Sequence, residues 1–290
     1  MGGLARRVGY ENALSKQVNG EVPVLQLDAG NMFSDDFNVK GASEDPRAKD
    51  EWMLRAYEQF QLTAANVSPR DLPYLGQMMT KDAYKANLKN FPMLGRMVSA
   101  NAIPASKDVM PFKPFVVEEV RGKRIGAKPL RIGILGLTEK PLVAGAPTGG
   151  YTISDPLEAA KKLVPELRKK CDLVVVLAYV DRETAKRIGI EAPGIDLVLA
   201  AHQFPLYNAV DEAGDAVVAY VASQTKWLGE IRLYRSGDSK AAAITNYVHR
   251  DVPLDTVIPD DPVAAKTVAD ARAQFQKGPP PPATGQERGH

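Results

Sequence analysis

The fold is decided by two stretches, Cys171-Asp-Leu-Val-Val-Val-Leu-Ala-Tyr-Val-Asp181 and Pro193-Gly-Ile-Asp-Leu-Val-Leu-Ala-Ala-His202. Each contains a nearly continuous run of β-branched and aliphatic residues with little polar alternation, which is typical of a strand covered on both faces. The residues between them, Arg182 to Ala192, are numerous enough for a helical crossover, and the pair Pro193-Gly194 would end that helix. We therefore expect two parallel central strands joined by a helix.

Polar or aromatic side chains stand where the predicted strands end. Tyr179 and His202 follow the two central strands, Asp28 and Asn31 follow a first predicted strand, and Asn66 follows a short one. In open α/β sheets the ligand lies beyond the carboxyl ends of the strands. These positions are therefore the candidates for a functional site.

The other elements follow from periodicity and from helix and turn signals. We expect helices over residues 4–18, 50–62, 80–90, 156–170 and 262–276, and strands over residues 22–28, 62–65, 115–120, 130–137, 216–222, 229–234 and 241–249. Residues 115–137 are expected to form a hairpin and the last three strands an antiparallel second sheet, while Pro165 should kink or shorten its helix. The prediction is an α/β fold, a two-sheet sandwich flanked by helices, with one domain over residues 1–276 and a Pro-rich linker or tail over residues 277–290.

Composition excludes several classes of function. The 290 residues are 44% hydrophobic, enough for a sizeable core, and carry 37 Lys and Arg against 35 Asp and Glu. No block of like charge predicts a nucleic-acid partner, no apolar run is long enough to span a membrane, and the start of the chain has no signal-peptide core. The single cysteine, Cys171, excludes an internal disulfide and a thiolate zinc cluster.

Several short stretches, taken in order, carry a family resemblance. They are Gly2–Arg7, Val24–Asn31, Asn66, Phe91-Pro92, Leu130–Thr138, Asp155-Pro156, Gly194–Leu197 with His202, Val221–Gln224, Leu228-Gly229 and Val252–Pro262. Together they resemble the calcineurin-like metallophosphoesterase domain of the bacterial periplasmic 5'-nucleotidase family, over nearly the whole chain. The resemblance implies that fold, and a pair of divalent ions about 4 Å apart that clamp a phosphate and activate a water. It is also the only ground for expecting a periplasmic or extracellular location.

The resemblance also indicates which metal ligands this chain lacks. The family's opening Asp-x-His motif belongs upstream of Gly2, where only Met1 stands, and the bridging Asp of its Gly-Asp motif falls on Asn31. Asn66 keeps the amide ligand of the Gly-Asn-His-Glu motif, but Val67 stands where the His belongs. A further His position is Tyr179. The closing Gly-His-x-His motif reads Ala201-His202-Gln203-Phe204, so we expect most of the metal-ligand positions to be substituted.

The residual positions also have plain structural interpretations. His202 is one of three histidines, with His249 and His290, and it is either a hydrogen-bonded structural residue or a remaining metal ligand. Asp28 is either a retained acid of the site or the residue of an Asx turn, and Asn31 and Asn66 also suit turns. At most Asp28, Asn31, Asn66 and His202 could bind a metal.

The leading hypothesis is a catalytically degenerate metallophosphoesterase domain that acts as a binding or scaffolding module, without a cofactor. It would belong to a larger extracytoplasmic protein or complex, with a protein partner or fused domain beyond the Pro-rich tail, such as a multihaem cytochrome. The alternative is an active metal-dependent phosphatase or 5'-nucleotidase, using manganese or zinc in a rearranged or externally completed site. A third hypothesis is a protein that binds a nucleotide without turnover.

Overall fold

The computed structural model describes residues 3–33, 46–123, 128–202, 209–221, 226–237 and 244–275. Its largest sheet has six strands in the order β10-β11-β9-β8-β6-β5. The two central strands are the predicted ones, β8 (Leu173–Tyr179) and β9 (Leu197–Ala201), and they pair in parallel. All seven residues of β8 are buried, which explains its unbroken aliphatic sequence.

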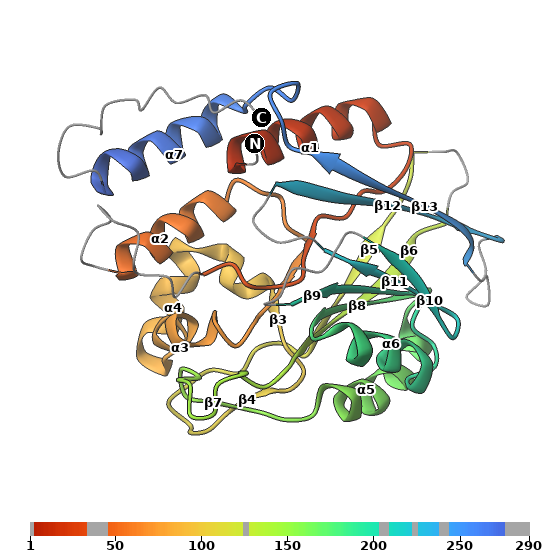
Figure 1. Ribbon diagram of the computed structural model, residues 1–290, viewed down its shortest axis with the longest axis horizontal. Helices are drawn as coiled ribbons and strands as arrows, with labels where there is room; N and C mark the ends of the chain where they lie inside the picture. The colour runs from red at the N-terminus through yellow and green to blue at the C-terminus, as the bar shows by residue number, and fades with distance from the viewer. Residues whose placement is uncertain are drawn as a thin grey trace, which may run out of the picture.

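Two helices, α5 (Pro156–Lys170) and α6 (Arg182–Glu191), cover one face of this sheet (Figure 1). The Asp155 carboxylate caps α5, and the Asp181 carboxylate caps α6 by accepting a hydrogen bond from the Thr184 amide at 2.8 Å. The predicted shortening at Pro165 is wrong, because α5 runs through it for 15 residues and keeps its apolar side buried against the sheet.

The remaining strands of the six-stranded sheet are β5 (Phe115–Val120), β6 (Leu130–Thr138), β10 (Val210–Ala213) and β11 (Ala216–Tyr220). The predicted hairpin is confirmed, since β5 and β6 pair antiparallel. The assignment of residues 216–222 to a separate antiparallel sheet is wrong. Instead, β11 pairs in parallel with β9 and antiparallel with β10, and this position between two strands buries all five of its residues.

A second layer covers the opposite face of the six-stranded sheet. It consists of a parallel sheet, β1 (Leu27–Asp28), β2 (Ala64–Asn66) and β3 (Met97–Val98), and of the predicted antiparallel pair β12 (Trp227–Arg235) and β13 (Ile244–Pro253). Side chains from both layers share one apolar cluster, which confirms the two-sheet architecture. The first strand is much shorter than predicted, because Pro23 has no amide to donate and Val22 and Val24 are exposed.

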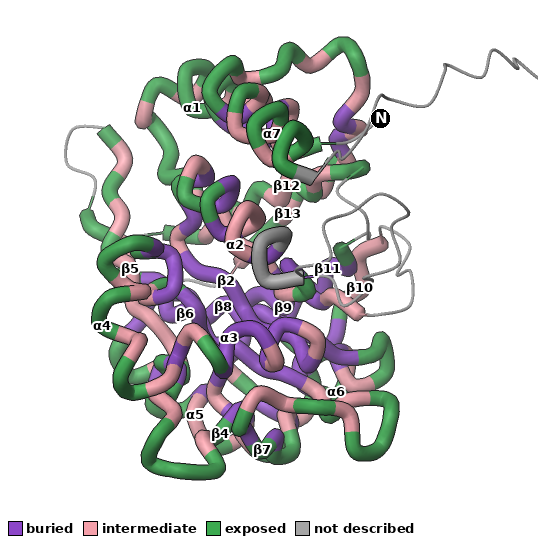
Figure 2. Tube along the Cα trace, turned by 90° about the vertical axis from the view of Figure 1, so that its left-hand side faces the viewer, coloured by how far each residue is buried: buried purple, intermediate pink, exposed green. Residues whose placement is uncertain are grey.

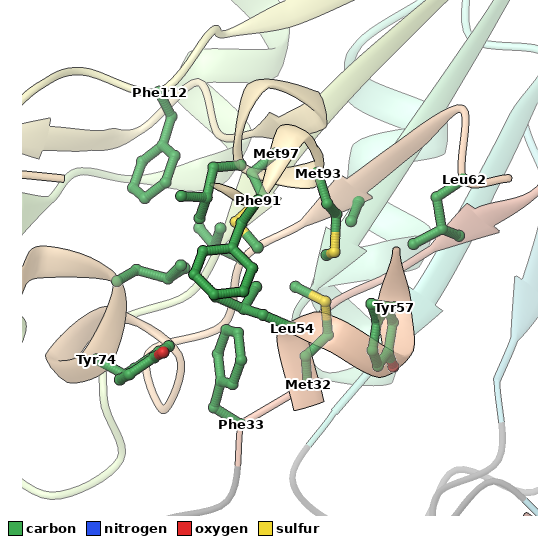
Figure 3. Close-up of a cluster of buried hydrophobic side chains, with 14 of the residues drawn as sticks. Met32, Phe33, Leu54, Tyr57, Leu62, Tyr74, Phe91, Met93, Met97 and Phe112 are labelled. Atoms are coloured by element: carbon green, nitrogen blue, oxygen red, sulfur yellow. The ribbon is translucent and has the colours of Figure 1, made fainter. Parts of the chain in front are cut away.

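The other helices surround the parallel three-stranded sheet. They are α1 (Leu4–Val18), α2 (Pro46–Tyr57), α3 (Leu72–Met78), α4 (Lys81–Asn90), the 3₁₀ helix η1 (Pro92–Arg96) and α7 (Pro262–Phe275). Helices α1 and α7 lie side by side (Figure 1). An aromatic and methionine-rich core fills the space beneath the helices (Figure 3), and Figure 2 shows the buried trace running through the middle of the molecule.

One helix boundary and two further elements differ from the predictions. Helix α2 begins and ends earlier than the predicted 50–62, and the sequence patterns predict neither α3 nor the short antiparallel pair of β4 (Ala102–Pro104) and β7 (Tyr151–Ile153). Helix α3 contains Gly76, which allows a close approach, since a Cβ there would lie 2.0 Å from the Gly149 carbonyl oxygen. Within the described ranges, no helix combines the length and apolarity needed to cross a membrane.

Candidate functional site

The five predicted positions lie along one edge of the molecule, at the carboxyl ends of strands. Asp28 is the last residue of β1 and Asn66 the last residue of the neighbouring β2, and Tyr179 ends β8 opposite Thr138 of β6. His202 follows β9 directly. The two sheets are joined at this edge, because the Asn66 side-chain amide donates to the Leu137 carbonyl of β6 at 2.7 Å. The candidate residues at this edge therefore form two groups. Asp28, Asn31 and Asn66 belong to the three-stranded sheet and its loops, and Tyr179 and His202 belong to the six-stranded sheet.

Asp28 is surrounded by donors from its own chain. Its Oδ1 accepts the Gly30 amide at 3.0 Å, which is the Asx turn considered from the sequence. Its Oδ2 accepts from the Arg7 guanidinium at 3.3 Å and from the Tyr57 hydroxyl at 3.2 Å. Both oxygens of this carboxylate thus have protein partners.

Asn31 is exposed and held in the left-handed region at φ 69°, a conformation that Asn tolerates better than most residues. Its backbone is fixed by Asp71, a fully buried residue whose carboxylate accepts the amides of Asn31 at 2.9 Å, Phe33 at 2.8 Å and Ser68 at 2.7 Å. Asp71 thereby ties the loop after β1 to the loop after β2. Burial raises its pKa to about 6, although the three amides act in the opposite direction.

Asn66 is fully buried and uses its side-chain NH₂ group as a bridge between strand ends. The group donates to the Ala29 carbonyl at 3.3 Å as well as to Leu137. Within the described part of the chain its Oδ1 has no hydrogen-bond partner, and it lies 2.8 Å from the position that a Cβ on Gly136 would take. The side chain is therefore packed between β2 and β6.

The second group consists of Tyr179 and His202. Their rings stack with centroids 6.0 Å apart, and the His202 Nε2 atom lies 2.8 Å from the Glu139 Oε1 atom. Glu139 directly follows β6, and its other oxygen accepts the Asp181 amide at 3.2 Å. The side chains of His202 and Glu139 are only 7% and 15% exposed, so this is a shielded acid–base pair.

Burial shifts both members of this pair toward their neutral forms. It raises the pKa of Glu139 to about 7, together with the negative charge of Asp181 and against the Asp181 amide. It lowers the pKa of His202, against the charge of Asp181. Both shifts favour the uncharged side chains, so a proton can be held or transferred between them in this poorly solvated place.

The two ions that the fold family implies need several converging ligands. In the described ranges, no group of three or more His, Cys, Asp or Glu side chains is arranged to hold a metal ion. The oxygens of Asp28 are taken up by Arg7, Tyr57 and Gly30, and the Asn66 amide is packed between strands. As they are arranged, these residues do not fit a two-metal centre.

Four residues that contribute to the site were not predicted from the sequence. Glu139 could have been found, because it follows a predicted strand just as Tyr179 does. Arg7 and Glu11 left a weaker signal, two charges four residues apart on the buried side of α1. Nothing in the sequence pattern around Asp71 distinguished it.

The other residues singled out from the sequence lie elsewhere. His249 is on β13 with Asp251 at 3.3 Å, Trp52 donates to Gln274 at 2.6 Å, and Trp227 stands 40% exposed on β12. His290, the end of the tail and the two residues after His202 fall outside the described residues.

Comparison with known proteins gives related sequences over part of the chain. No family model matches it. A 5'-nucleotidase of Vibrio cholerae is 33% identical over 118 residues, which make up 39% of this chain and 19% of that protein. A 2',3'-cyclic-nucleotide 2'-phosphodiesterase/3'-nucleotidase of Salmonella typhimurium is 28% identical over 131 residues, 40% of this chain and 20% of that protein. The matches thus span about a fifth of the length of these curated relatives.

Solved structures match over nearly the whole chain. The sulfate thiohydrolase SoxB of Thermus thermophilus superposes with a TM-score of 0.75 at 16% identity, covering 95% of this chain and 47% of that one. The calcineurin-like phosphoesterase YfkN of Bacillus subtilis superposes with a TM-score of 0.73 at 15% identity, covering 95% and 90%. These structures establish that the chain has the calcineurin-like phosphoesterase fold, and the sequence matches show that part of it is similar to bacterial 5'-nucleotidases.

Proposed function

We propose that this chain is a catalytically degenerate metallophosphoesterase domain that acts as a binding or scaffolding module in a larger extracytoplasmic protein or complex. The observation that carries the proposal is that Asp28 and Asn66, two of the residual ligand positions, form hydrogen bonds within the fold. Asp28 accepts from Arg7, Tyr57 and Gly30, and Asn66 bridges two strand ends. Both oxygens of Asp28 are engaged by these partners, and the Asn66 NH₂ group holds that side chain between β2 and β6.

The electrostatics of the edge support the same proposal. A bridging ligand between two divalent ions needs negative charge, and Asn31 offers a neutral amide. The remaining His202 faces Glu139 within hydrogen-bond distance, so its Nε2 already has a partner inside the fold. The polar side chains at these strand ends therefore form hydrogen bonds with one another and with the neighbouring loops.

The alternative is an active metal-dependent phosphoric ester hydrolase. It is favoured by the names of the sequence relatives, which are nucleotidases, and by the shielded His202–Glu139 pair at the strand tips. A rearranged site would have to free Asp28 from Arg7 and turn His202 away from Glu139. Each change would leave a buried group without a partner, which costs about 1–3 kcal/mol for a neutral group and more for a charged one.

Hydrolysis assays test the proposal. The purified chain is incubated with Mn²⁺ or Zn²⁺ and with p-nitrophenyl phosphate, bis(p-nitrophenyl) phosphate or 5'-AMP, beside the variants Asp28→Asn and His202→Ala. Enzymes typically turn over at about 1–10³ s⁻¹, and we expect no saturable turnover above about 10⁻³ s⁻¹. Saturable, metal-dependent turnover that falls at least tenfold in either variant would contradict the proposal, since a contaminating phosphatase would not respond to these substitutions.

Nucleotide binding without turnover is tested separately. A ligand that binds the folded state raises its melting temperature, and above its Kd the rise grows with the logarithm of ligand concentration. A scaffold without a nucleotide site predicts the same melting temperature with and without 5'-AMP, whereas a concentration-dependent rise that is lost on His202→Ala would identify a nucleotide-binding module.

A further inference from the structure

Arg7 is a charged residue in the interior of the fold. It lies on the buried side of α1, and its side chain is 8% exposed. The guanidinium Nε atom lies 3.0 Å from Glu11 Oε1, and Nη1 lies 3.3 Å from Asp28 Oδ2. The guanidinium carbon also lies 4.3 Å from the centroid of the Phe60 ring, within the range of a cation–π contact.

Two carboxylates contact this guanidinium, and a hydroxyl group donates to one of them. Glu11 comes from α1, Asp28 from the end of β1 and Tyr57 from the end of α2, and the Tyr57 hydroxyl donates to the same Asp28 oxygen that Arg7 contacts. Glu11 is 8% exposed and Tyr57 5% exposed, so little solvent reaches the group. Carboxylate and hydroxyl oxygens are the groups that hard divalent cations prefer.

The charges of this cluster depend on Arg7. Burial alone would lower the pKa of Arg7, but the negative charges of Asp28 and Glu11 outweigh it and raise that pKa, so the guanidinium stays protonated. Burial raises the pKa of Glu11, and Arg7 acts against this rise. Without Arg7, two carboxylates would face each other in a place with little solvent, a situation that a bound cation relieves.

We infer that the Arg7 guanidinium is the resident cation of an oxygen-lined site formed by Glu11, Asp28 and Tyr57, and that it closes this site to divalent ions. The inference rests on the proposed loss of metal-dependent catalysis. The inference adds that the positive charge at the end of β1 comes from a side chain, Arg7. Arg7 lies on α1, a helix that the family resemblance does not assign to the metal centre. An ordinary structural ion pair makes no such prediction about metals.

The test replaces the charge and keeps the packing. In Arg7→Met the side chain still contacts Phe60, while the cation is lost. The matched control is Arg6→Met, the neighbouring arginine, which pairs at 3.5 Å with the half-exposed Asp260 on another loop. Melting temperatures and bound Mn²⁺ per chain, by electron paramagnetic resonance of free Mn²⁺, are measured with and without Mn²⁺.

We expect saturating Mn²⁺ to raise the melting temperature of Arg7→Met by about 3 °C or more with one ion bound, and to leave the wild type and Arg6→Met unchanged. The gain should vanish in Arg7→Met combined with Asp28→Asn. If Arg7→Met does not unfold cooperatively, Arg7→Gln, which keeps polar contacts without the charge, gives the same readout.

Two results would overturn the inference. One is that neither uncharged Arg7 variant gains Mn²⁺-dependent stabilisation. The other is that the wild type itself binds Mn²⁺ and loses that binding on Asp28→Asn. The proposed function fails on a different result, phosphoester turnover by the wild type, so the two failures can be told apart.

Discussion

Asp71 gives the most informative test of how the strand-tip loops are held. The residue is fully buried, and it accepts amides from the loop after β1 and from the loop after β2. The substitution Asp71→Asn keeps the shape and removes the charge. Because burial raises the pKa of Asp71 to about 6, from an ordinary value of 3.8, the folded state holds a proton that the unfolded state has already released.

The sign and size of the effect follow from proton linkage. Stability falls with rising pH wherever the folded state binds more protons, so the wild type loses stability between pH values near 4 and 6. At about 1.4 kcal/mol per pH unit, the total is about 3 kcal/mol, of which about 2 kcal/mol falls between pH 4.5 and 7.5. Asn does not titrate and resembles the protonated acid. The free energy of unfolding of Asp71→Asn, relative to that of the wild type, should therefore rise by about 2 kcal/mol from pH 4.5 to pH 7.5.

Urea unfolding at pH 4.5 and pH 7.5 measures this difference. The control Asp155→Asn changes another aspartate that accepts backbone amides but stands exposed at the start of α5, so it separates the effect of burial from the loss of an amide acceptor. The reasoning is refuted if the difference between Asp71→Asn and the wild type is the same at both pH values. It is also refuted if the wild type gains stability relative to the variant at pH 7.5, since the three amides would then outweigh burial.

Three further predictions concern the same edge and its support. Asn66→Ala should lower the free energy of unfolding by about 2–4 kcal/mol in urea titrations, because two buried carbonyls lose their donor; an effect below 0.5 kcal/mol would show that the bridge is unimportant. Because the pKa of Glu139 is raised to about 7, the wild type should lose stability as the pH rises from 5 to 8. Glu139→Gln should reduce this loss by up to about 3 kcal/mol. An unchanged pH profile of stability would contradict the shielded pair. Gly76→Ala should lower the melting temperature by several degrees, since its Cβ would lie 2.0 Å from the Gly149 carbonyl oxygen, while Gly237→Ala, with nothing within 4 Å, should not.

The parts of the fold that depend on local pattern were predictable. The aliphatic runs of β8 and β9 each carry their own signal, and the structure contains both strands. Strand β11 was placed in the wrong sheet because its pairing depends on distant residues of β9 rather than on its own alternation. Helix α3 is short and depends on the close contact of Gly76 with Gly149, which no local pattern records.

The sequence predicted where the candidate residues lie, but not which residues contact them. The rule that ligands lie beyond strand ends placed Asp28, Asn66, Tyr179 and His202 correctly along one edge. Their partners, Arg7, Tyr57 and Asp71, come from helices and loops far along the chain, so their roles depend on tertiary packing alone. Whether the residual positions bind a metal stays a prediction.

Bound metal per chain is the measurement that tests the central claim most directly. The purified chain is loaded with an excess of Mn²⁺ or Zn²⁺, freed of unbound ions and analysed by inductively coupled plasma mass spectrometry. A degenerate site, with Asp28 held by Arg7 and Asn66 packed between strands, predicts close to zero ions per chain. Close to two ions per chain, lost on substitution of Asp28 or His202, would contradict the account.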